Sequence, residues 1–234
     1  MRLTCIMGSL EINDDSIIIY SHLVTYGNGA TPEITELIRY EIEWMWNEPG
    51  ASVRIGRHFL KVNFKITAEY NASITPVDIY ENTDPRNNYF RIEEFAHGNI
   101  SFVDGLGCNT GYFKVENLYA GSTTAAHEYG HTLGLSHPED LDFRGRGIPG
   151  IMYPRGTLVD PEFQYNPSGN AGDSSNGGTM HPKYRRVRVE DIADLRLDRI
   201  NFNSSQPMIG EFSSVWHPDH VTISRDEWLP GIMG

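Results

Sequence analysis

The chain has 234 residues, a length that suits one large domain or a domain with two subdomains. An apolar fraction of 39% with 11% aromatic residues is enough for a substantial core. The formal net charge of −12 argues against nucleic acid or an anionic membrane as a partner, because both select basic surfaces. The acidity is compatible with a structural Ca²⁺, but no EF-hand loop appears and solubility is the simpler explanation.

The opening residues 1–8 lack the long apolar core of a secretory signal peptide, and no apolar run predicts a membrane span. A mature form that begins after a removed leader is the alternative. Cys5 and Cys108 could form one long-range disulfide in an oxidising compartment, or could remain two thiols.

The first half of the chain has the pattern of an α/β unit. Thr31-Pro32-Glu33 supplies an N-cap, an N1 proline and an acidic first turn, which predict a helix that ends at Pro49-Gly50. Trp44 and Trp46 are expected to complete the packing of this helix. β-rich or alternating runs predict strands around it. These runs cover residues 16–24, 53–70 (a strand or hairpin), 76–80, 100–103 and 111–115.

The most informative segment follows these strands and reads H-E-x-x-H-x-x-G-x-x-H over residues 127–137. His127 and His131 are four residues apart, so they project from the same helical face and can chelate one Zn²⁺. Glu128 is placed beside the metal, where a general base for a bound water belongs. Gly134 allows a sharp turn that brings back His137 as a third ligand. Three protein ligands leave an open position, which is typical of a catalytic zinc.

The residues around this motif predict a short helix. Hydroxyl residues over 121–124 offer N-caps, and Ala125 and Ala126 favour helix. Tyr129 and Leu133 are spaced i,i+4 and are expected to face the core, on a different stripe from the metal ligands.

A methionine turn, Gly150-Ile151-Met152-Tyr153-Pro154, follows the third histidine. With the long zinc motif, it resembles the metzincin metallopeptidases, and its I-M-Y-P wording is most similar to the matrixin branch. The resemblance implies that Met152 forms a hydrophobic base beneath the three histidines. It also implies an α+β fold with a cleft between two subdomains of a single catalytic domain, residues 1–234. The upper subdomain (1–134) would hold a twisted mixed sheet and the zinc helix, and the lower one (135–234) would be irregular and end in a helix.

Several positions depart from the matrixin pattern. Residues 138–149 look like an insertion before the methionine turn. Pro154 stands where astacin-like members carry a tyrosine, and Gly156 stands where matrixins often carry a tyrosine in the specificity pocket. The resemblance therefore does not predict the side-chain preference. His97 lacks the neighbours of a second, structural zinc site, so only one zinc ion is expected.

The remaining C-terminal residues contain a turn-rich loop over 160–181 and a predicted helix over 188–200. The apolar side of that helix consists of Val189, Ile192 and Leu195. His217 and His220 are expected to be surface residues. By the resemblance, an edge strand pairs with extended substrate, and residues 99–103 and 111–115 are the two candidates.

These features predict a zinc-dependent endopeptidase in which Glu128 acts as general base and then as general acid. The expected partners are protein or peptide substrates, with no nucleic acid and no membrane span, and the favoured state is a secreted monomer. Only 126 residues precede His127, which leaves no room for a large inhibitory propeptide. Two alternatives stay open: a catalytically silent zinc-binding domain, and a toxin or effector peptidase restrained by an inhibitor or immunity protein.

Overall fold

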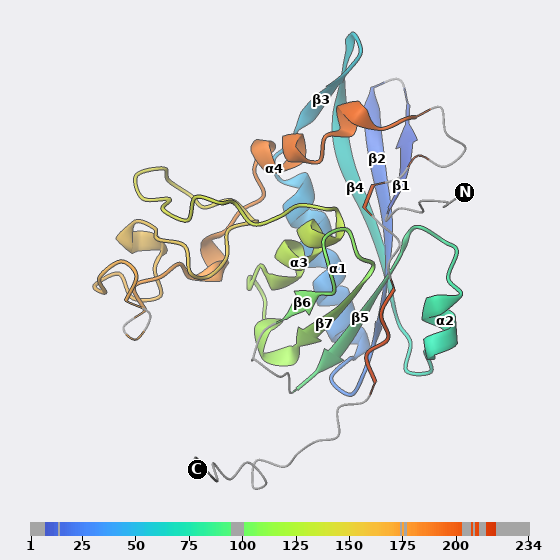
Figure 1. Ribbon diagram of the computed structural model, residues 1–234, viewed down its shortest axis with the longest axis horizontal. Coiled ribbons are helices and arrows are strands. Elements are labelled where there is room, and N and C mark those ends of the chain that lie inside the picture. The colour runs from blue at the N-terminus through green and yellow to red at the C-terminus, as the bar shows by residue number, and fades with distance from the viewer. Residues whose placement is uncertain are drawn as a thin grey trace, which may run out of the picture.

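The structure is a computed structural model, and one mixed sheet is its largest element. Helices α1 and α3 cover one face of this sheet, and a lobe of loops projects beyond them (Figure 1). The mixed α+β class predicted from the sequence is therefore confirmed. The structure describes residues 8–13, 15–94, 101–173, 175, 177–202, 207, 209–210 and 214–218.

The sheet has the strand order β3-β4-β2-β5-β7-β6, with β1 paired to β2 beside this path. The four central strands run parallel, because β2 pairs with both β4 and β5, and β5 pairs with β7. The outer strands β1, β3 and β6 are antiparallel to their neighbours. The strands are β1 (Ser9–Ile12), β2 (Ser16–Tyr26), β3 (Ser52–Ile55), β4 (His58–Tyr70), β5 (Asn87–Glu93), β6 (Phe102–Val103) and β7 (Thr110–Lys114).

The predicted strands over 16–24 and 111–115 and the hairpin over 53–70 are confirmed as β2, β7 and β3–β4. The predicted strand over 76–80 is wrong, because this segment is the short helix α2 (Pro76–Tyr80). Its start is a capping box in which Thr75 and Asp78 bond each other's backbone N–H, and a proline occupies the first turn. That local signal outweighs the β-branched composition.

Four α-helices occur in the described residues. They are α1 (Pro32–Asn47), α2, α3 (Thr124–Thr132) and α4 (Val189–Asp194). None of these helices combines the length and the apolar character that crossing a bilayer requires.

Helix α1 begins as predicted, with the Thr31 hydroxyl accepting a hydrogen bond from the backbone N–H of Ile34 at 3.2 Å. Trp46 is buried, but Trp44 is 49% exposed, so the expectation that both tryptophans pack inside is half wrong. At the other end, the Asn47 side chain bonds both the N–H and the carbonyl of Phe64. The helix is thereby fastened to strand β4 at its last turn.

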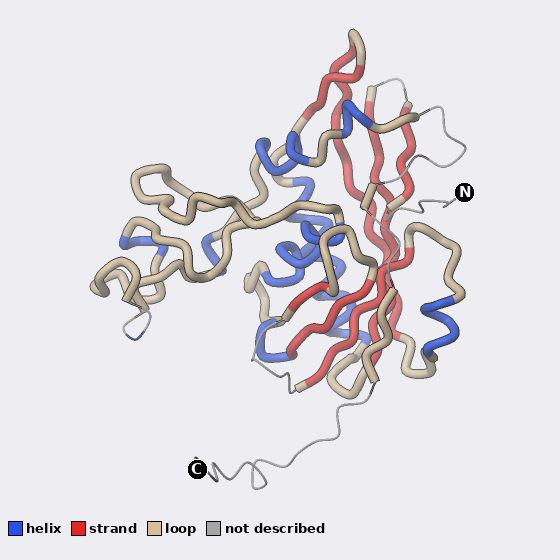
Figure 2. The backbone as a smooth tube through the Cα atoms, viewed as in Figure 1, coloured by secondary structure: helices blue, strands red, loops and turns tan. Residues whose placement is uncertain are grey.

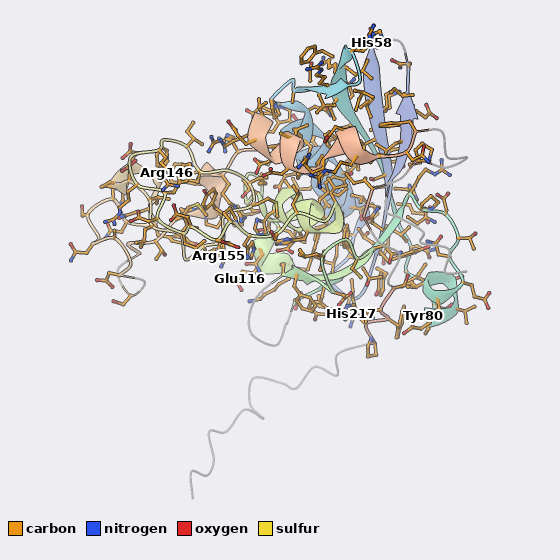
Figure 3. The ribbon with its side chains drawn as sticks, turned by 45° about the horizontal axis from the view of Figure 1, so that its top comes forward. His58, Tyr80, Glu116, Arg146, Arg155 and His217 are labelled. Carbon is orange, nitrogen blue, oxygen red and sulfur yellow. The ribbon has the colours of Figure 1, made fainter. Side chains whose placement is uncertain are left out.

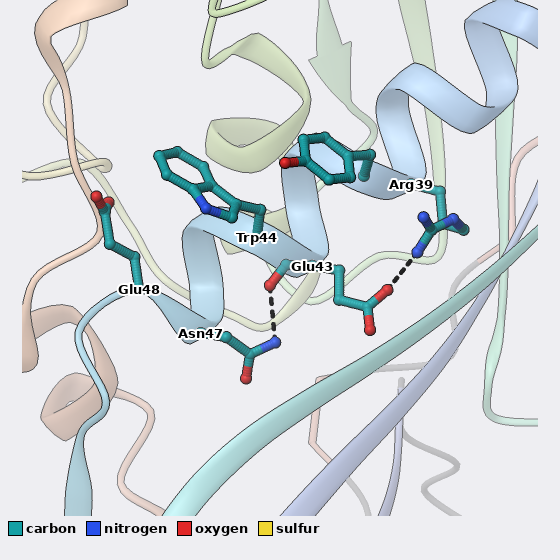
Figure 4. A pocket seen from close by; sticks show the side chains of 6 residues that line it. Arg39, Glu43, Trp44, Asn47 and Glu48 are labelled. Carbon is teal, nitrogen blue, oxygen red and sulfur yellow. Dashed lines mark hydrogen bonds and ion pairs between the residues drawn. The ribbon is translucent and has the colours of Figure 1, made fainter.

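The exposed side of α1 forms a shallow groove that contains Trp44 (Figure 4). Two interactions run along this groove. Arg39 forms an ion pair with Glu43, and the Asn47 side chain donates to the carbonyl of Glu43. The residues lining this groove are Arg39, Tyr40, Glu43, Trp44, Asn47 and Glu48.

The projecting lobe is made almost entirely of loops (Figure 2). The described part of 160–181 consists of loops, bends and 3-10 turns such as Pro161–Phe163, and so agrees with the predicted irregular segment. The helix predicted over 188–200 is shorter, because α4 ends at Asp194 and a separate 3-10 turn, Leu197–Arg199, follows Arg196 in a left-handed conformation. Ile192 and Leu195 are buried as expected, whereas Val189 is 52% exposed.

Asp191 connects α4 to the methionine turn. Its carboxylate accepts a bond from the backbone N–H of Arg188 at 2.7 Å and lies against Gly150 and Ile151. Burial raises the pKa of Asp191 to about 6 from its usual 3.8. The folded protein therefore holds this proton more tightly than the unfolded chain does.

It follows that the contribution of Asp191 to stability is greatest below about pH 4 and is lost as pH rises through about 6. We predict that Asp191→Asn gains stability relative to wild type over this interval, because Asn cannot ionise. Urea unfolding at several pH values between 4 and 7 measures the difference. The exposed Glu162→Gln serves as the control for loss of one negative charge. A difference between Asp191→Asn and wild type that stays constant with pH contradicts the prediction.

Candidate metal centre

Helix α3 carries the first two histidines of the motif, and contacts from other elements of the fold hold it in place. Thr123 precedes it in a left-handed conformation (φ 62°) and makes no capping bond, but the Ser122 hydroxyl accepts a bond from the N–H of Thr124 at 3.2 Å, as the hydroxyl residues predicted. In addition, the Glu41 carboxylate of α1 accepts a bond from the N–H of Ala126, and the Trp46 indole donates to the Ala126 carbonyl at 3.0 Å. Helix α1 thus fixes the position of α3.

The three predicted ligands converge on one point. The Nε2 atom of His137 lies 3.1 Å from Nε2 of His127 and 3.1 Å from Nε2 of His131. All three ligand nitrogens lie within 4.8 Å of one another. Among the described residues, no other group of three His, Cys, Asp or Glu side chains clusters in this way.

Backbone carbonyls hold two of these rings in place. Nδ1 of His127 donates to the carbonyl of Ile151 at 2.6 Å, and Nδ1 of His131 donates to the carbonyl of Leu135 at 2.7 Å. A carbonyl can only accept, so Nδ1 carries the proton in both rings. Each Nε2 atom is then left with its lone pair directed at the common point.

Burial favours the neutral form of all three imidazoles. Desolvation lowers the pKa of His131 to about 4, and it also lowers the pKa values of His127 and His137. The positive charge of Arg185 acts in the same direction on each. Neutral imidazole is the form that binds a metal, so the three rings favour the protonation state that metal binding requires.

Gly134 provides the turn that the motif spacing requires. It adopts φ +91°, in the left-handed region that favours glycine. The N–H of Leu135 then bonds back to the carbonyl of Gly130 at 3.0 Å, which closes the helix end. The chain reverses here and returns His137 to the other two ligands, as the sequence predicted.

Met152 is buried beneath α3, against Gly130. A Cβ atom at Gly130 would lie 2.3 Å from Sδ of Met152 and 3.1 Å from the Trp46 ring. Such distances are far inside van der Waals contact, so only glycine allows the methionine turn to approach the helix this closely. The sequence reasoning missed Gly130, although a glycine in the middle of a short helix is an available signal for close packing.

Glu128 is adjacent to the first ligand and points into the same cleft. It is 7% exposed, and burial raises its pKa to about 8. The positive charge of Arg185 and a backbone hydrogen bond at Val103 oppose this rise. A bound cation beside Glu128 would favour its ionised form in the same way.

The cleft around these residues has a volume of about 710 Å³. It brings together the zinc-motif helix, the segment after Met152 and the edge strand β6. Its wall contains two arginines that the sequence analysis did not single out, Arg155 and Arg185. The lining residues are Ser101, Phe102, Val103, Gly105, Leu106, Asn117, Thr124, His127, Glu128, His131, Ser136, His137, Pro154, Arg155, Gly156 and Arg185.

Of the two candidate edge strands, the structure places β6 at the end of the strand order. In the part of the chain that the structure describes, β6 pairs on one side only, with β7, whereas β7 lies between β5 and β6. Phe102 and Val103 also line the cleft. Residues 99–100, at the start of the candidate that contains β6, lie outside the described residues.

His217 and Cys108, which the structure describes, do not join this site. His217 is not the surface residue expected, because its ring bonds both carboxylate oxygens of Asp104 at 2.9 and 3.0 Å. Figure 3 shows it near Tyr80, whose hydroxyl accepts a bond from the neighbouring residue Trp216. Cys108 is buried, with its sulfur 3.4 Å from the Thr110 hydroxyl. Cys5, His97 and His220 lie outside the described residues.

No protein-family model matches the chain, and no curated protein is significantly similar to it. The histidine geometry and the contents of the cleft are therefore the evidence from which a function must be argued.

The contact between Gly130 and Met152 gives a packing prediction. Gly130→Ala should lower the free energy of unfolding by about 1–3 kcal/mol, because the added methyl overpacks the site. Alanine is the better helix former, so propensity alone predicts the opposite sign. Truncation of the neighbour in Met152→Ala should remove most of this cost. Urea unfolding of the two single variants and the double variant measures the coupling.

Gly134→Ala is the matched control, since no atom lies within 4 Å of its added methyl and its cost comes from φ +91°. That cost should be the same with Met152 or Ala at position 152. Equal costs for Gly130→Ala in both backgrounds would show that the contact does not limit packing.

Proposed function

We propose that this protein is a zinc-dependent endopeptidase of the metzincin type. The observation that carries the proposal is the convergence of three imidazole Nε2 atoms in a cleft whose wall contains one carboxylate, Glu128. Three histidine ligands and an open side are typical of a catalytic zinc, whereas structural zinc sites are closed by four protein ligands.

The donor set fits Zn²⁺ in number and type, and the two separations from His137 fit it in spacing. Tetrahedral zinc with nitrogens at about 2.0–2.1 Å keeps those nitrogens about 3.3–3.4 Å apart. The two separations of 3.1 Å from His137 are close to this value. The Nδ1 bonds to the carbonyls of Ile151 and Leu135 supply the second hydrogen bond that metal-binding histidines usually make.

When bound, zinc supplies a Lewis acid that polarises the scissile carbonyl and lowers the pKa of a water. The chain's own residues perform the proton transfers. Glu128 accepts a proton from the attacking water and then gives it to the leaving nitrogen of the peptide. Its burial suits both steps, because a raised pKa brings proton affinity near neutral pH. No serine or cysteine nucleophile is required by this scheme.

An extended substrate is the form that the cleft favours. The open edge of β6 can pair with a peptide backbone, and the same strand lines the cleft beside Glu128. The peptide bond would then pass in front of the three histidines. Residues 135–234 take the role of the lower metzincin subdomain in this scheme, with Met152 supporting the ligands from below.

The proposed proton transfer gives a direct prediction for Glu128→Gln. The isosteric amide cannot exchange protons, so kcat/KM should fall by about 10²–10⁴-fold or more. Zinc content should stay at that of wild type, because Glu128 is not a ligand. A mixed peptide library analysed by mass spectrometry reports cleavage, and metal analysis of the same samples reports zinc.

The outcomes separate the competing functions. A wild-type protein that holds one zinc and cuts no peptide is a silent zinc-binding domain. Retention of full activity by Glu128→Gln would exclude Glu128 as the base. Asp160→Asn, a carboxylate-to-amide change in the projecting lobe, controls for the charge and should cleave like wild type.

Metal removal should affect stability as well as activity. A ligand that binds only the folded chain stabilises it by mass action, so chelation should lower the melting temperature and readdition of Zn²⁺ should restore it. The His131→Ala variant should lose this response, since its second ligand is gone. A melting temperature that is independent of zinc in the wild type contradicts a zinc site at the histidines.

A further inference from the structure

The charge of the cleft is opposite to that of the chain. The whole protein has 31 acidic and 19 basic residues, but the cleft is lined by two arginines and a single carboxylate. That carboxylate is Glu128, which the proposed mechanism already uses. Arg155 and Arg185 therefore remain as cations without an assigned role.

Arg185 is held rigidly at the cleft wall. It is 4% exposed, and its Nε atom donates to the Thr123 hydroxyl at 2.9 Å. Its two Nη atoms donate to the carbonyls of Tyr153 at 3.2 Å and of Thr123 at 3.4 Å. These bonds connect the start of α3 to the methionine turn, so the guanidinium position is fixed before any ligand binds.

All of these acceptors are neutral. Among the described residues, Glu128 and Glu41 are the carboxylates that act on Arg185, and both act through charge and not through a hydrogen bond. The three bonds engage three of its five N–H donors, which leaves two with no protein partner in the described part of the chain. Burial without a paired anion disfavours the charged form and lowers the pKa of Arg185 to about 10. At neutral pH the group is still a cation.

Arg155 adds a second positive charge on the same wall. It is exposed, donates to the Asn117 side chain at 3.1 Å, and is close enough to Arg185 for their charges to interact unfavourably. Figure 3 shows Arg155 near the base of the projecting lobe, with Arg146 farther out. Gly156 follows it and presents no side chain, so this wall leaves room for a substrate group.

The position of this wall indicates which substrate residue it meets. Glu128 gives its proton to the leaving nitrogen, so that nitrogen must lie on the Glu128 side of the metal. Arg185 is close enough to Glu128 for its charge to act on that carboxylate, and Thr124 and the segment 154–156 line the same cleft. We therefore direct the side chain of the residue that contributes the leaving nitrogen toward the two arginines.

We propose that this wall is a specificity pocket for an acidic side chain, Asp or Glu, immediately after the scissile bond. The assignment rests on the proposed peptidase function and adds the class of substrate. A carboxylate there accepts from the two unengaged N–H groups of Arg185 and neutralises a buried charge. Arg155 attracts the same group at the entrance.

Peptides that wild type cleaves provide the test, after mass spectrometry has mapped the bond that is cut. Four versions of one peptide carry Glu, Gln, Leu or Lys immediately after that bond. For wild type, kcat/KM for the Glu peptide should be about tenfold or more above kcat/KM for the isosteric Gln peptide. The Lys peptide should have the lowest kcat/KM of the four. The ratio of kcat/KM for the Glu peptide to kcat/KM for the Gln peptide, measured in one sample, does not depend on the fraction of active enzyme.

Arg185→Gln keeps a hydrogen-bonding side chain and should bring the Glu-to-Gln ratio close to one. Arg185 also connects two structural elements, so Arg155→Gln and Arg155→Glu provide variants at an exposed position. Both variants should reduce the Glu-to-Gln ratio, and Arg155→Glu should reduce it more than Arg155→Gln. Lys183→Gln makes the same charge change outside the cleft lining and should leave the wild-type ratio unchanged.

Preference for Leu over Glu in wild type, or a ratio unaffected by both Arg185→Gln and Arg155→Glu, would overturn the acidic pocket and leave the peptidase function standing. A zinc-loaded protein that cleaves none of the library peptides would overturn both.

Discussion

The convergence of three imidazole rings depends on where two backbone carbonyls point. The carbonyls of Ile151 and Leu135 accept the Nδ1 protons of His127 and His131, which leaves both Nε2 lone pairs directed at one point. The carbonyl of Ile151 belongs to the methionine turn, and the carbonyl of Leu135 belongs to the turn made by Gly134. The histidine cluster is therefore oriented by backbone whose path depends on one glycine and one closely packed methionine.

Support for that backbone comes from distant parts of the chain. Helix α1 holds α3 through Glu41 and Trp46, and α1 is itself fastened to strand β4 through Asn47. On the other side, Arg185 connects the start of α3 to the methionine turn. The sheet thus positions the histidines from a distance, and the irregular lobe carries only the second wall of the cleft.

The sequence was informative where the chemistry is local. The spacing of the histidines predicted their convergence, Gly134 predicted the reversal, and Thr31-Pro32-Glu33 predicted the start of α1. It was wrong at 76–80, where a capping box outweighed β-type composition. The expected surface position of His217 was wrong because Asp104, 113 positions away, bonds its ring.

The residues that sequence reasoning missed act over long separations. Glu41 bonds Ala126 across 85 positions of sequence and Arg185 bonds Thr123 across 62, so no local sequence pattern predicts either contact. A buried arginine in particular has no periodic signature, because its burial depends on acceptors that only the folded chain supplies. The convergence of the three histidines could therefore be predicted from their spacing, whereas the charge of the cleft beside them could not.

A crystal structure of the zinc-loaded protein, with anomalous data collected on both sides of the zinc edge, tests directly whether the three histidines hold zinc. We predict one zinc per chain with Nε2 of His127, His131 and His137 at about 2.0–2.1 Å and one side open to the cleft. Zinc held through other residues, or by a fourth protein ligand that closes the site, would contradict it.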